Sequence, residues 1–197
     1  MQKIIVLLIA LSIVQSMKAQ ENSRAYYKSQ STVALGYGIG NVWKRVFKAN
    51  APNGGASYDI NSTGPVSLVY EYGFTKRISG GIALGYSQVK AVLTYGPLIN
   101  TERLTNYSAL ARANYHFGHD PKWDLYAGGG IGYYKFTYDS KDNSGNNNSG
   151  SGIKVPGAFG STAELGAKYY VKPCFAVFAE AGYVAGSYGQ LGVNVRF

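Results

Sequence analysis

The chain ends on Leu191-Gly192-Val193-Asn194-Val195-Arg196-Phe197, in which apolar side chains alternate with small or polar ones. A period of two predicts a β-strand with one apolar face, because successive side chains of a strand point to opposite sides. The same alternation occurs in segment after segment from Thr32 onward. The alternation of apolar with small or polar residues in this closing stretch is therefore the pattern that decides the whole fold.

Working back from this end, the alternation predicts eight strands joined by connections of alternating length. The expected strands are residues 32–40, 64–74, 79–91, 102–117, 123–136, 156–171, 174–186 and 188–197. The short connections are 75–78, 118–122 and 172–173, and the long polar ones are 41–63, 92–101 and 139–155. The last hairpin, at residues 186–188, is tight although it lies on the long-loop side. This arrangement predicts an up-and-down meander of antiparallel strands.

One face of every predicted strand is apolar, and the other is small or polar. A soluble barrel of the lipocalin type would turn the apolar face inward around a ligand, whereas a membrane barrel turns it outward to lipid. The polar face here is rich in Gly and Ala and carries few charges, which suits a narrow lumen better than a wet exterior. We therefore predict an all-β, eight-stranded antiparallel up-and-down transmembrane β-barrel, with the soluble ligand-binding barrel as the alternative.

Aromatic residues mark both ends of the predicted apolar face. The fragments Leu35-Gly36-Tyr37, Leu84-Gly85-Tyr86, Ile131-Gly132-Tyr133 and Ala181-Gly182-Tyr183 recur at regular intervals, one in each odd-numbered strand. Aromatic side chains of membrane barrels gather at the two lipid–water boundaries. We expect an outer girdle of Tyr37, Tyr86, Tyr133 and Tyr183 and an inner girdle of Phe74, Phe117, Tyr169 and Phe197.

The N-terminus has the pattern of a secretory signal peptide. Lys3 precedes an apolar run from Ile4, and a more polar stretch ends at Ala19. The run is shorter than the ~20 apolar residues that a spanning helix needs, so a retained anchor helix is the weaker interpretation. We expect a signal peptide at 1–19 and one outer-membrane β-barrel domain at 20–197. Because Cys174 is the single cysteine, the chain has no intrachain disulfide.

The composition narrows the class of partner. The chain carries 19 Lys and Arg against 10 Asp and Glu, a formal net charge of +9, with 26 Gly and 18 Tyr. An exported chain rarely meets nucleic acid, so we interpret the basic excess as favouring anionic membrane surfaces and expect no nucleic-acid partner.

Two segments carry a family resemblance. Leu165-Gly166-Ala167-Lys168-Tyr169-Tyr170 through Phe178-Ala179-Glu180-Ala181-Gly182-Tyr183, together with the closing strand, resembles the small outer-membrane β-barrel family, a porin-like group that includes the barrel domain of outer-membrane protein A and outer-membrane protein X. The resemblance implies the bacterial outer membrane, and a C-terminal strand read by the barrel-assembly machinery. We expect no periplasmic domain after the last strand of the kind found in outer-membrane protein A, so peptidoglycan binding is not carried over.

Signals for catalysis or cofactor binding are weak. Glycine-rich fragments at residues 36–38 and 128–132 do not complete a dinucleotide-binding motif, because Asn41 and Tyr133 stand at the third glycine positions. His116, His119 and Asp120 offer an incomplete metal site, and we interpret the histidines as turn residues. We therefore expect no enzyme activity, no cofactor and no metal.

Charged residues on the inward face form the first candidate site, a lumenal charge network of Glu71, Arg112, Glu164, Lys168, Glu180 and Arg196. Unpaired burial of these charges would be costly, so they should pair across the lumen. A polar plug that fills the interior is the structural interpretation, and a gate or ion path is the functional one.

The second candidate site is a cationic, aromatic stretch of the first long loop, namely Trp43, Lys44, Arg45, Phe47 and Lys48. Such a stretch suits contact with lipopolysaccharide phosphates or with a partner surface. We expect a structural or surface-interaction barrel that displays its loops and contacts outer-membrane lipid. A small channel is the alternative, and the sequence identifies no extracellular partner.

Overall fold

The computed structural model describes residues 24–49, 51, 57–143, 157–184 and 186–197. The predicted signal peptide and its cleavage site lie outside these residues. Within them, no helix is long and apolar enough to cross a membrane.

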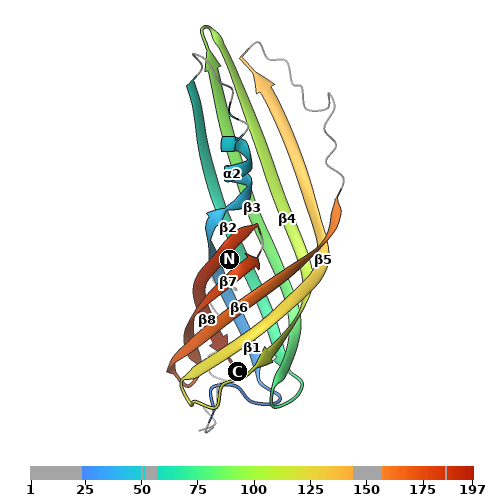
Figure 1. Ribbon diagram of the computed structural model, residues 1–197, viewed down its shortest axis with the longest axis vertical. Coiled ribbons are helices and arrows are strands. Elements are labelled where there is room, and N and C mark those ends of the chain that lie inside the picture. The colour runs from blue at the N-terminus through green and yellow to red at the C-terminus, as the bar shows by residue number, and fades with distance from the viewer. Residues whose placement is uncertain (1–23, 50, 52–56, 144–156, 185) are drawn as a thin grey trace, which may run out of the picture.

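Eight antiparallel strands close into a barrel in which each strand pairs with its neighbours in sequence and β1 pairs with β8 (Figure 1). The predicted fold is therefore confirmed. The strands are β1 (Ser31–Asn41), β2 (Ser57–Gly73), β3 (Ile78–Tyr95), β4 (Leu98–His116), β5 (Trp123–Asp142), β6 (Ala158–Lys172), β7 (Phe175–Val184) and β8 (Ser187–Arg196), with one helix, α2 (Val42–Ala49), between β1 and β2.

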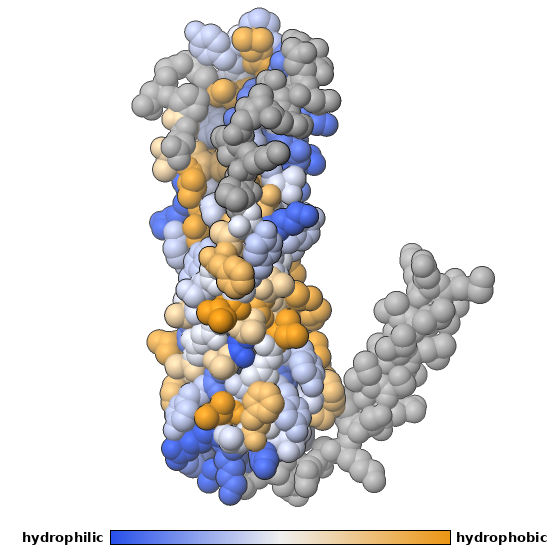
Figure 2. All heavy atoms as spheres, turned by 90° about the vertical axis from the view of Figure 1, so that its right-hand side faces the viewer, coloured by the Kyte–Doolittle hydropathy of each residue, from blue (hydrophilic) through white to orange (hydrophobic). Residues whose placement is uncertain are grey.

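The barrel wall is apolar on its outside. Leu35, Ile82 and Leu165 are 53%, 57% and 64% exposed, although each is paired on both sides within the sheet. Figure 2 shows one side of this wall, where apolar residues gather around the lower half of the molecule with hydrophilic residues below them. Water does not favour so much contiguous apolar surface, whereas a lipid bilayer does.

Four strands, β2 to β5, extend four or more residues beyond their predicted upper ends. β2 starts at Ser57, and β3 and β4 continue to a tight hairpin in which Tyr95 pairs with Leu98. The predicted loops at 41–63 and 92–101 are therefore wrong. The first holds α2 and the start of β2, and its period was hidden because the register shifts between Thr63 and Val66. The second is strand apart from its turn.

The extra length forms a four-stranded extension, the upper sheet, which rises above the ends of β1, β6, β7 and β8 (Figure 1). The upper sheet comprises residues 57–63, 88–95, 98–105 and 135–142. Its inner face continues the lumenal face of the barrel and buries Val89, Ala91 and Leu104. Its outer face exposes charged side chains such as Lys90 and Arg103.

Helix α2 lies against the inner face of the upper sheet. Asn41 caps its first turn, because the Asn41 Oδ1 accepts a hydrogen bond from the Lys44 N–H at 3.1 Å. The Trp43 ring meets the Phe136 ring edge to face, with centroids 4.9 Å apart. The helix contacts β2 and β3 rather than the lipid-facing wall.

The lumen of the barrel is filled by side chains. Gly166 illustrates how the inward glycines make room, since a Cβ at this position would lie 2.2 Å from Cζ of Tyr126. The Tyr126 ring, only 1% exposed, occupies that space. Eight strands enclose an interior just wide enough for side chains, and the glycines admit the larger ones.

Residues 24–30, here called the N-terminal strap, cross the end of the barrel where the short turns lie (Figure 1). The Ala25 N–H donates to the Asp120 carbonyl at 2.8 Å, and the Ser29 N–H donates to the Gly73 carbonyl at 2.7 Å. Ala25 and Tyr26 are 1% and 4% exposed. The strap therefore closes the lumen at this end.

Candidate functional site

The predicted inward charges separate into two clusters. In the first, the Arg112 Nη2 lies 2.9 Å from Glu164 Oε1 and 2.8 Å from Glu180 Oε1, with all three side chains almost fully buried. The Tyr126 hydroxyl donates to Glu180 Oε1 at 2.7 Å, and the Gln190 amide donates to the other oxygen of Glu180. Arg112 thus bridges β4 to β6 and β7 across the lumen.

The second cluster centres on Lys168 and lies nearer the strap. The Lys168 Nζ is 3.2 Å from Glu71 Oε2 and 4.0 Å from Asp124 Oδ2. His116 joins these acids, with Nδ1 2.7 Å from Asp124 and Nε2 3.2 Å from Glu71. Asn114 also donates to Glu71 at 3.2 Å. Glu71 thus has several donors, whereas Asp124 has one hydrogen bond, from His116, and the more distant charge of Lys168.

Arg196 was expected to pair with an acid, and the structure corrects this. Its guanidinium donates to the carbonyl of Ala25 at 2.6 Å and to the carbonyl of Pro173. The same group lies over the rings of Tyr27 and Tyr170, at 5.1 Å and 4.2 Å from their centroids. Main-chain oxygens and aromatic faces replace a carboxylate here, so Arg196 fastens the strap to the last strand.

Two members of the Lys168 cluster were missed from the sequence. The interpretation of His116 as a turn residue is wrong, because it is the last residue of β4 and is 2% exposed on the lumenal side. Asp124, the second residue of β5, is 1% exposed. The alternation of side chains along the strands indicates that both face the lumen, because Asp124 has the inward parity of Tyr126 and His116 has that of Asn114.

A chain of close contacts in this cluster resembles a nucleophile, a base and an orienting acid, and it consists of Ser79, His116 and Asp124. The Ser79 Oγ is 2.9 Å from His116 Nε2, and His116 Nδ1 is 2.7 Å from Asp124. However, the Ser79 hydroxyl donates its proton to Glu71 Oε1 at 2.5 Å, so it is not available to the imidazole. Ser79 is also 1% exposed. A buried hydroxyl oriented in this way serves the ion-pair network and offers no surface to a substrate.

Tyr26 of the strap covers this cluster. Its ring stacks on the His116 ring with centroids 3.6 Å apart and planes 3° apart. Its hydroxyl donates to the carbonyl of Ile78 at 2.7 Å and lies 3.1 Å from the carbonyl of Thr75. Burial, and then the charge of Glu71, raises the pKa of the Tyr26 phenol well above its usual range, so the phenol stays neutral.

No group of three or more His, Cys, Asp or Glu side chains within the described ranges could hold a metal ion. His119 and Asp120 are exposed in the turn after β4, whereas His116 is buried. The three residues weighed as an incomplete metal site therefore do not converge.

Comparison with known proteins identifies the family. Residues 4–197 match the family described as outer membrane protein beta-barrel domain. The chain belongs to this outer-membrane β-barrel family. It is therefore a bacterial outer-membrane barrel protein, as the sequence resemblance implied.

Solved structures and curated proteins add the following. The chain is similar to the outer membrane protein OprG from Pseudomonas aeruginosa, at 12% identity and a TM-score of 0.50, covering 87% of this chain and 97% of that one. It is also similar to Ail, the attachment invasion locus protein of Yersinia pestis, in complex with the heparin analogue sucrose octasulfate, at 16% identity and a TM-score of 0.47, covering 86% and 99%. No curated protein matches the chain. At these identities the likeness concerns the fold alone.

The predicted girdle residues of this outer-membrane barrel all lie on its outward face. Phe74, Phe117 and Phe197, near the short turns, are 57%, 47% and 48% exposed. Tyr37, Tyr133 and Tyr183, toward the other end, are 59%, 48% and 36% exposed, and Tyr86 and Tyr169 are half-buried. Their separation along the strands suits two lipid–water boundaries.

The predicted surface-contact residues divide between two faces of α2. Trp43 and Phe47 are half-buried, and the Trp43 ring packs on Phe136 of the upper sheet. Lys44, Arg45 and Lys48 are exposed. The amphipathic helix partly covers its aromatic rings and leaves its cations in solvent, a division that a linear loop could not predict.

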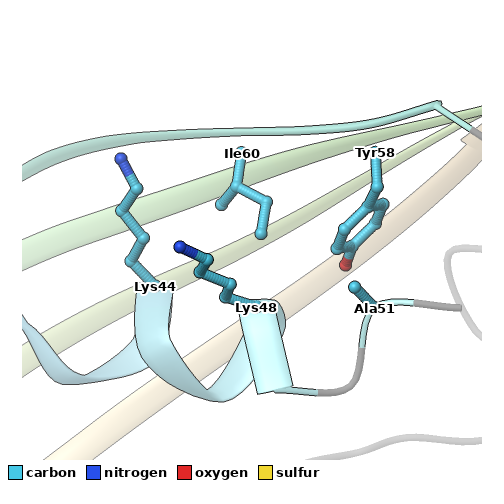
Figure 3. Close-up of a pocket in the computed structure, with 5 residues that line it drawn as sticks. All are labelled: Lys44, Lys48, Ala51, Tyr58 and Ile60. Atoms are coloured by element: carbon cyan, nitrogen blue, oxygen red, sulfur yellow. The ribbon is translucent and has the colours of Figure 1, made fainter.

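Two cations of α2, Lys44 and Lys48, border a pocket of about 390 Å³ between the helix and β2 (Figure 3). Figure 3 shows Lys44 and Lys48 rising from α2 beside Ile60, with Tyr58 further along the same strand and Ala51 below it. Arg45 is turned elsewhere, with its guanidinium 5.3 Å from the centroid of the Tyr188 ring. The pocket combines two ammonium groups with an aromatic and an aliphatic floor.

Proposed function

We propose that this outer-membrane barrel is a surface-interaction protein, without enzymatic activity, whose contact element is α2 on the upper sheet. The observation that carries the proposal is the cationic helix beside the pocket of Lys44, Lys48, Tyr58 and Ile60. The partner we infer is lipopolysaccharide, because its phosphates offer anionic groups and its sugar rings can lie on an aromatic floor.

The position of the cations along the helix supports this choice. Lys44 and Lys48 are four residues apart, so they lie on one side of α2 and repel each other by a few tenths of a kcal/mol. Within the described ranges, neither forms an ion pair with a carboxylate. Two unneutralised ammonium groups beside one pocket are complementary to a phosphate group.

The depth of the helix supports the same partner. Ile39, near the end of β1, is 55% exposed on the outward face, and α2 begins at Val42. Three residues of strand span about 10 Å, so α2 starts within reach of the lipid headgroups. Placing this end of the barrel on the cell surface brings Lys44, Arg45 and Lys48 to the level of lipopolysaccharide phosphates.

The lumen does not favour the alternative of a small channel. Arg112 and Lys168 occupy its middle in buried contacts with four carboxylates, and the strap covers one end. An eight-stranded barrel filled in this way leaves little continuous water. In planar bilayers we expect no large, stable single-channel conductance from the wild-type protein.

The binding proposal is tested with purified folded barrel and phosphorylated lipopolysaccharide. The variant Lys44→Gln, Arg45→Gln, Lys48→Gln should weaken binding about tenfold or more, since each lost phosphate contact removes a charge-assisted interaction. The control Lys90→Gln, Arg103→Gln, Lys141→Gln removes the same charge from exposed strand residues of the upper sheet. It should bind normally.

A second arm uses lipopolysaccharide from which the phosphates have been removed. Wild-type protein should bind this ligand about as weakly as the α2 variant binds the phosphorylated one. Equal loss of binding in both triple variants, or full binding of the dephosphorylated ligand, would show that α2 is not the phosphate contact.

A further inference from the structure

The short-turn end of the barrel carries a second, separate concentration of positive charge. Six exposed cations come from the strap, from two turns and from the end of β6, and together we call them the basic rim. The basic rim consists of Arg24, Lys28, Lys76, Arg77, Lys122 and Lys172.

The basic rim is almost unopposed. Among the described residues of this end, Asp120 is the one exposed acid, since Glu71 and Asp124 are buried in the lumen. The Asp120 carboxylate is engaged by its own turn, where Oδ1 accepts the N–H groups of Lys122 and Trp123 at 2.7 and 2.9 Å. These two bonds lower the pKa of Asp120. The described carboxylates form no ion pair with the rim.

The cations stand directly at the edge of the lipid-facing wall. Lys122 is followed by Trp123, which is 48% exposed, and Lys172 follows Val171, which is 58% exposed. Lys76 lies two residues after Phe74, which is 57% exposed. At about 3.3 Å per residue, each ammonium group begins within about 7 Å of an apolar side chain that faces lipid. Long Lys side chains reach from such positions to the headgroups.

Arg77 shows the same arrangement in a direct contact. Its Nη1 donates to the hydroxyl of Tyr115 at 2.8 Å, and the Tyr115 ring lies 5.5 Å from the Phe117 ring on the outward face. The guanidinium is thus held at the polar tip of an aromatic pair that marks the membrane boundary.

The strap brings the remaining two cations into the rim. Arg24 and Lys28 flank the buried residues Ala25 and Tyr26, whose contacts fix the strap under the barrel. The charges therefore surround the closed mouth of the barrel rather than lying on one side of it.

We propose that the basic rim is a binding surface for anionic phospholipid headgroups of the inner leaflet of the outer membrane, such as phosphatidylglycerol. The rim cations lie beside lipid-facing aromatic and aliphatic residues, which favours a lipid surface over a soluble acidic partner. Each Lys or Arg near an anionic leaflet attracts its headgroups, so several together select anionic over zwitterionic lipid. This inference uses a different end of the molecule and different residues from the α2 proposal, and it does not depend on it.

The test measures lipid selectivity in bilayers that contain both lipid types. The folded barrel is reconstituted in phosphatidylcholine with a minor fraction of spin-labelled phosphatidylglycerol or phosphatidylcholine, and the motionally restricted lipid is quantified by electron paramagnetic resonance. Wild-type protein should enrich phosphatidylglycerol about two- to threefold, and added salt should weaken the enrichment.

Two charge-matched variants locate the effect. The rim variant carries Lys28→Gln, Lys76→Gln, Lys122→Gln and Lys172→Gln. It should lower the ratio of bound phosphatidylglycerol to bound phosphatidylcholine to about one, which means no selectivity. The control Lys90→Gln, Arg103→Gln, Lys135→Gln, Lys141→Gln removes four charges from the upper sheet and should keep it. Both variants should fold, because all eight side chains are exposed.

Three results would overturn the proposal. One is the absence of enrichment in the wild-type protein, and another is equal loss in both variants. The third is cosedimentation of the wild-type protein, but not of the rim variant, with purified peptidoglycan, in a protein that shows no lipid selectivity. That outcome would assign the rim to the cell wall.

Discussion

Tyr26 lies flat against His116, with 3.6 Å between the ring centroids and 3° between the ring planes. Tyr26 precedes the first strand, whereas His116 ends the fourth, so the stack joins the N-terminal strap to the buried Lys168 cluster. The strap is thereby part of the lumenal packing and not a loose leader to β1.

The strap should contribute measurably to stability. Tyr26→Ala removes the stacked ring and both hydroxyl contacts, and we expect it to lower the free energy of unfolding by about 3 kcal/mol. Tyr26→Phe keeps the ring and should cost about 1 kcal/mol, the value of a hydrogen bond. Urea unfolding in lipid vesicles measures both, with the exposed Lys28→Ala as a control within 0.5 kcal/mol or so. Wild-type stability of Tyr26→Ala would show that the strap merely rests on the barrel.

Among the lumenal charges, we expect removal of Arg112 to lower the free energy of unfolding the most. Arg112→Ala leaves Glu164 and Glu180 buried without their cation, which costs about 3–5 kcal/mol for a fully buried pair. The surface change Lys44→Ala should leave the unfolding curve unchanged. Unchanged stability of Arg112→Ala, together with large conductance of the wild-type protein, would favour the channel function instead.

The alternation of side chains was sufficient to predict the number, order and facing of the strands, because the lipid wall requires an apolar residue at every second position. It was not sufficient to predict their ends. Beyond the membrane, the upper sheet buries only one partly covered face, so polar residues such as Asn100 and Thr101 continue the strand without an apolar signal. The bulge between Thr63 and Val66 broke the period at the start of β2.

The lumenal site could be predicted only in part, for a similar reason. Inward parity placed Glu71, Arg112 and Lys168 inside, and the same parity applied to the predicted strand 123–136 also places Asp124 there. The partners of Arg196 could not have been found, since main-chain carbonyls and a strap without periodicity leave no pattern in the sequence.

The orientation of the barrel can be tested by cysteine labelling. In a Cys174→Ser background, Tyr95→Cys in the upper hairpin should react with a membrane-impermeant maleimide on intact cells. Lys76→Cys in the β2–β3 turn should react only after the outer membrane is permeabilised. Long connections face outward and short turns inward in bacterial barrels. The reverse labelling pattern would invert the barrel and place the basic rim outside. Surface proteolysis of whole cells should also cut the predicted loop 139–155 near Asn146, a position outside the described residues.

Phe197 should matter more for assembly than for stability. Its main chain closes the barrel, since the Phe197 N–H donates to Ser31 O at 3.0 Å and the Ser31 N–H donates to Phe197 O at 3.1 Å. Phe197→Ala keeps these bonds and removes a ring that is already 48% exposed. The loss in unfolding free energy should therefore be only about 1–2 kcal/mol, measured by refolding in vesicles.

In cells, we expect the same variant to accumulate much less folded barrel, because the family resemblance implies that the terminal aromatic ring is part of a signal read by the barrel-assembly machinery. The matched control is Phe159→Ala, which removes a lipid-facing ring that is 84% exposed and lies far from the C-terminus. Heat-modifiable mobility on gels measures the folded fraction of each. If both variants reduce folded yield equally, the ring acts through lipid contact alone. If Phe197→Ala alone lowers the folded yield in cells, and by more than its small loss of stability in vesicles explains, the last residue is read during assembly.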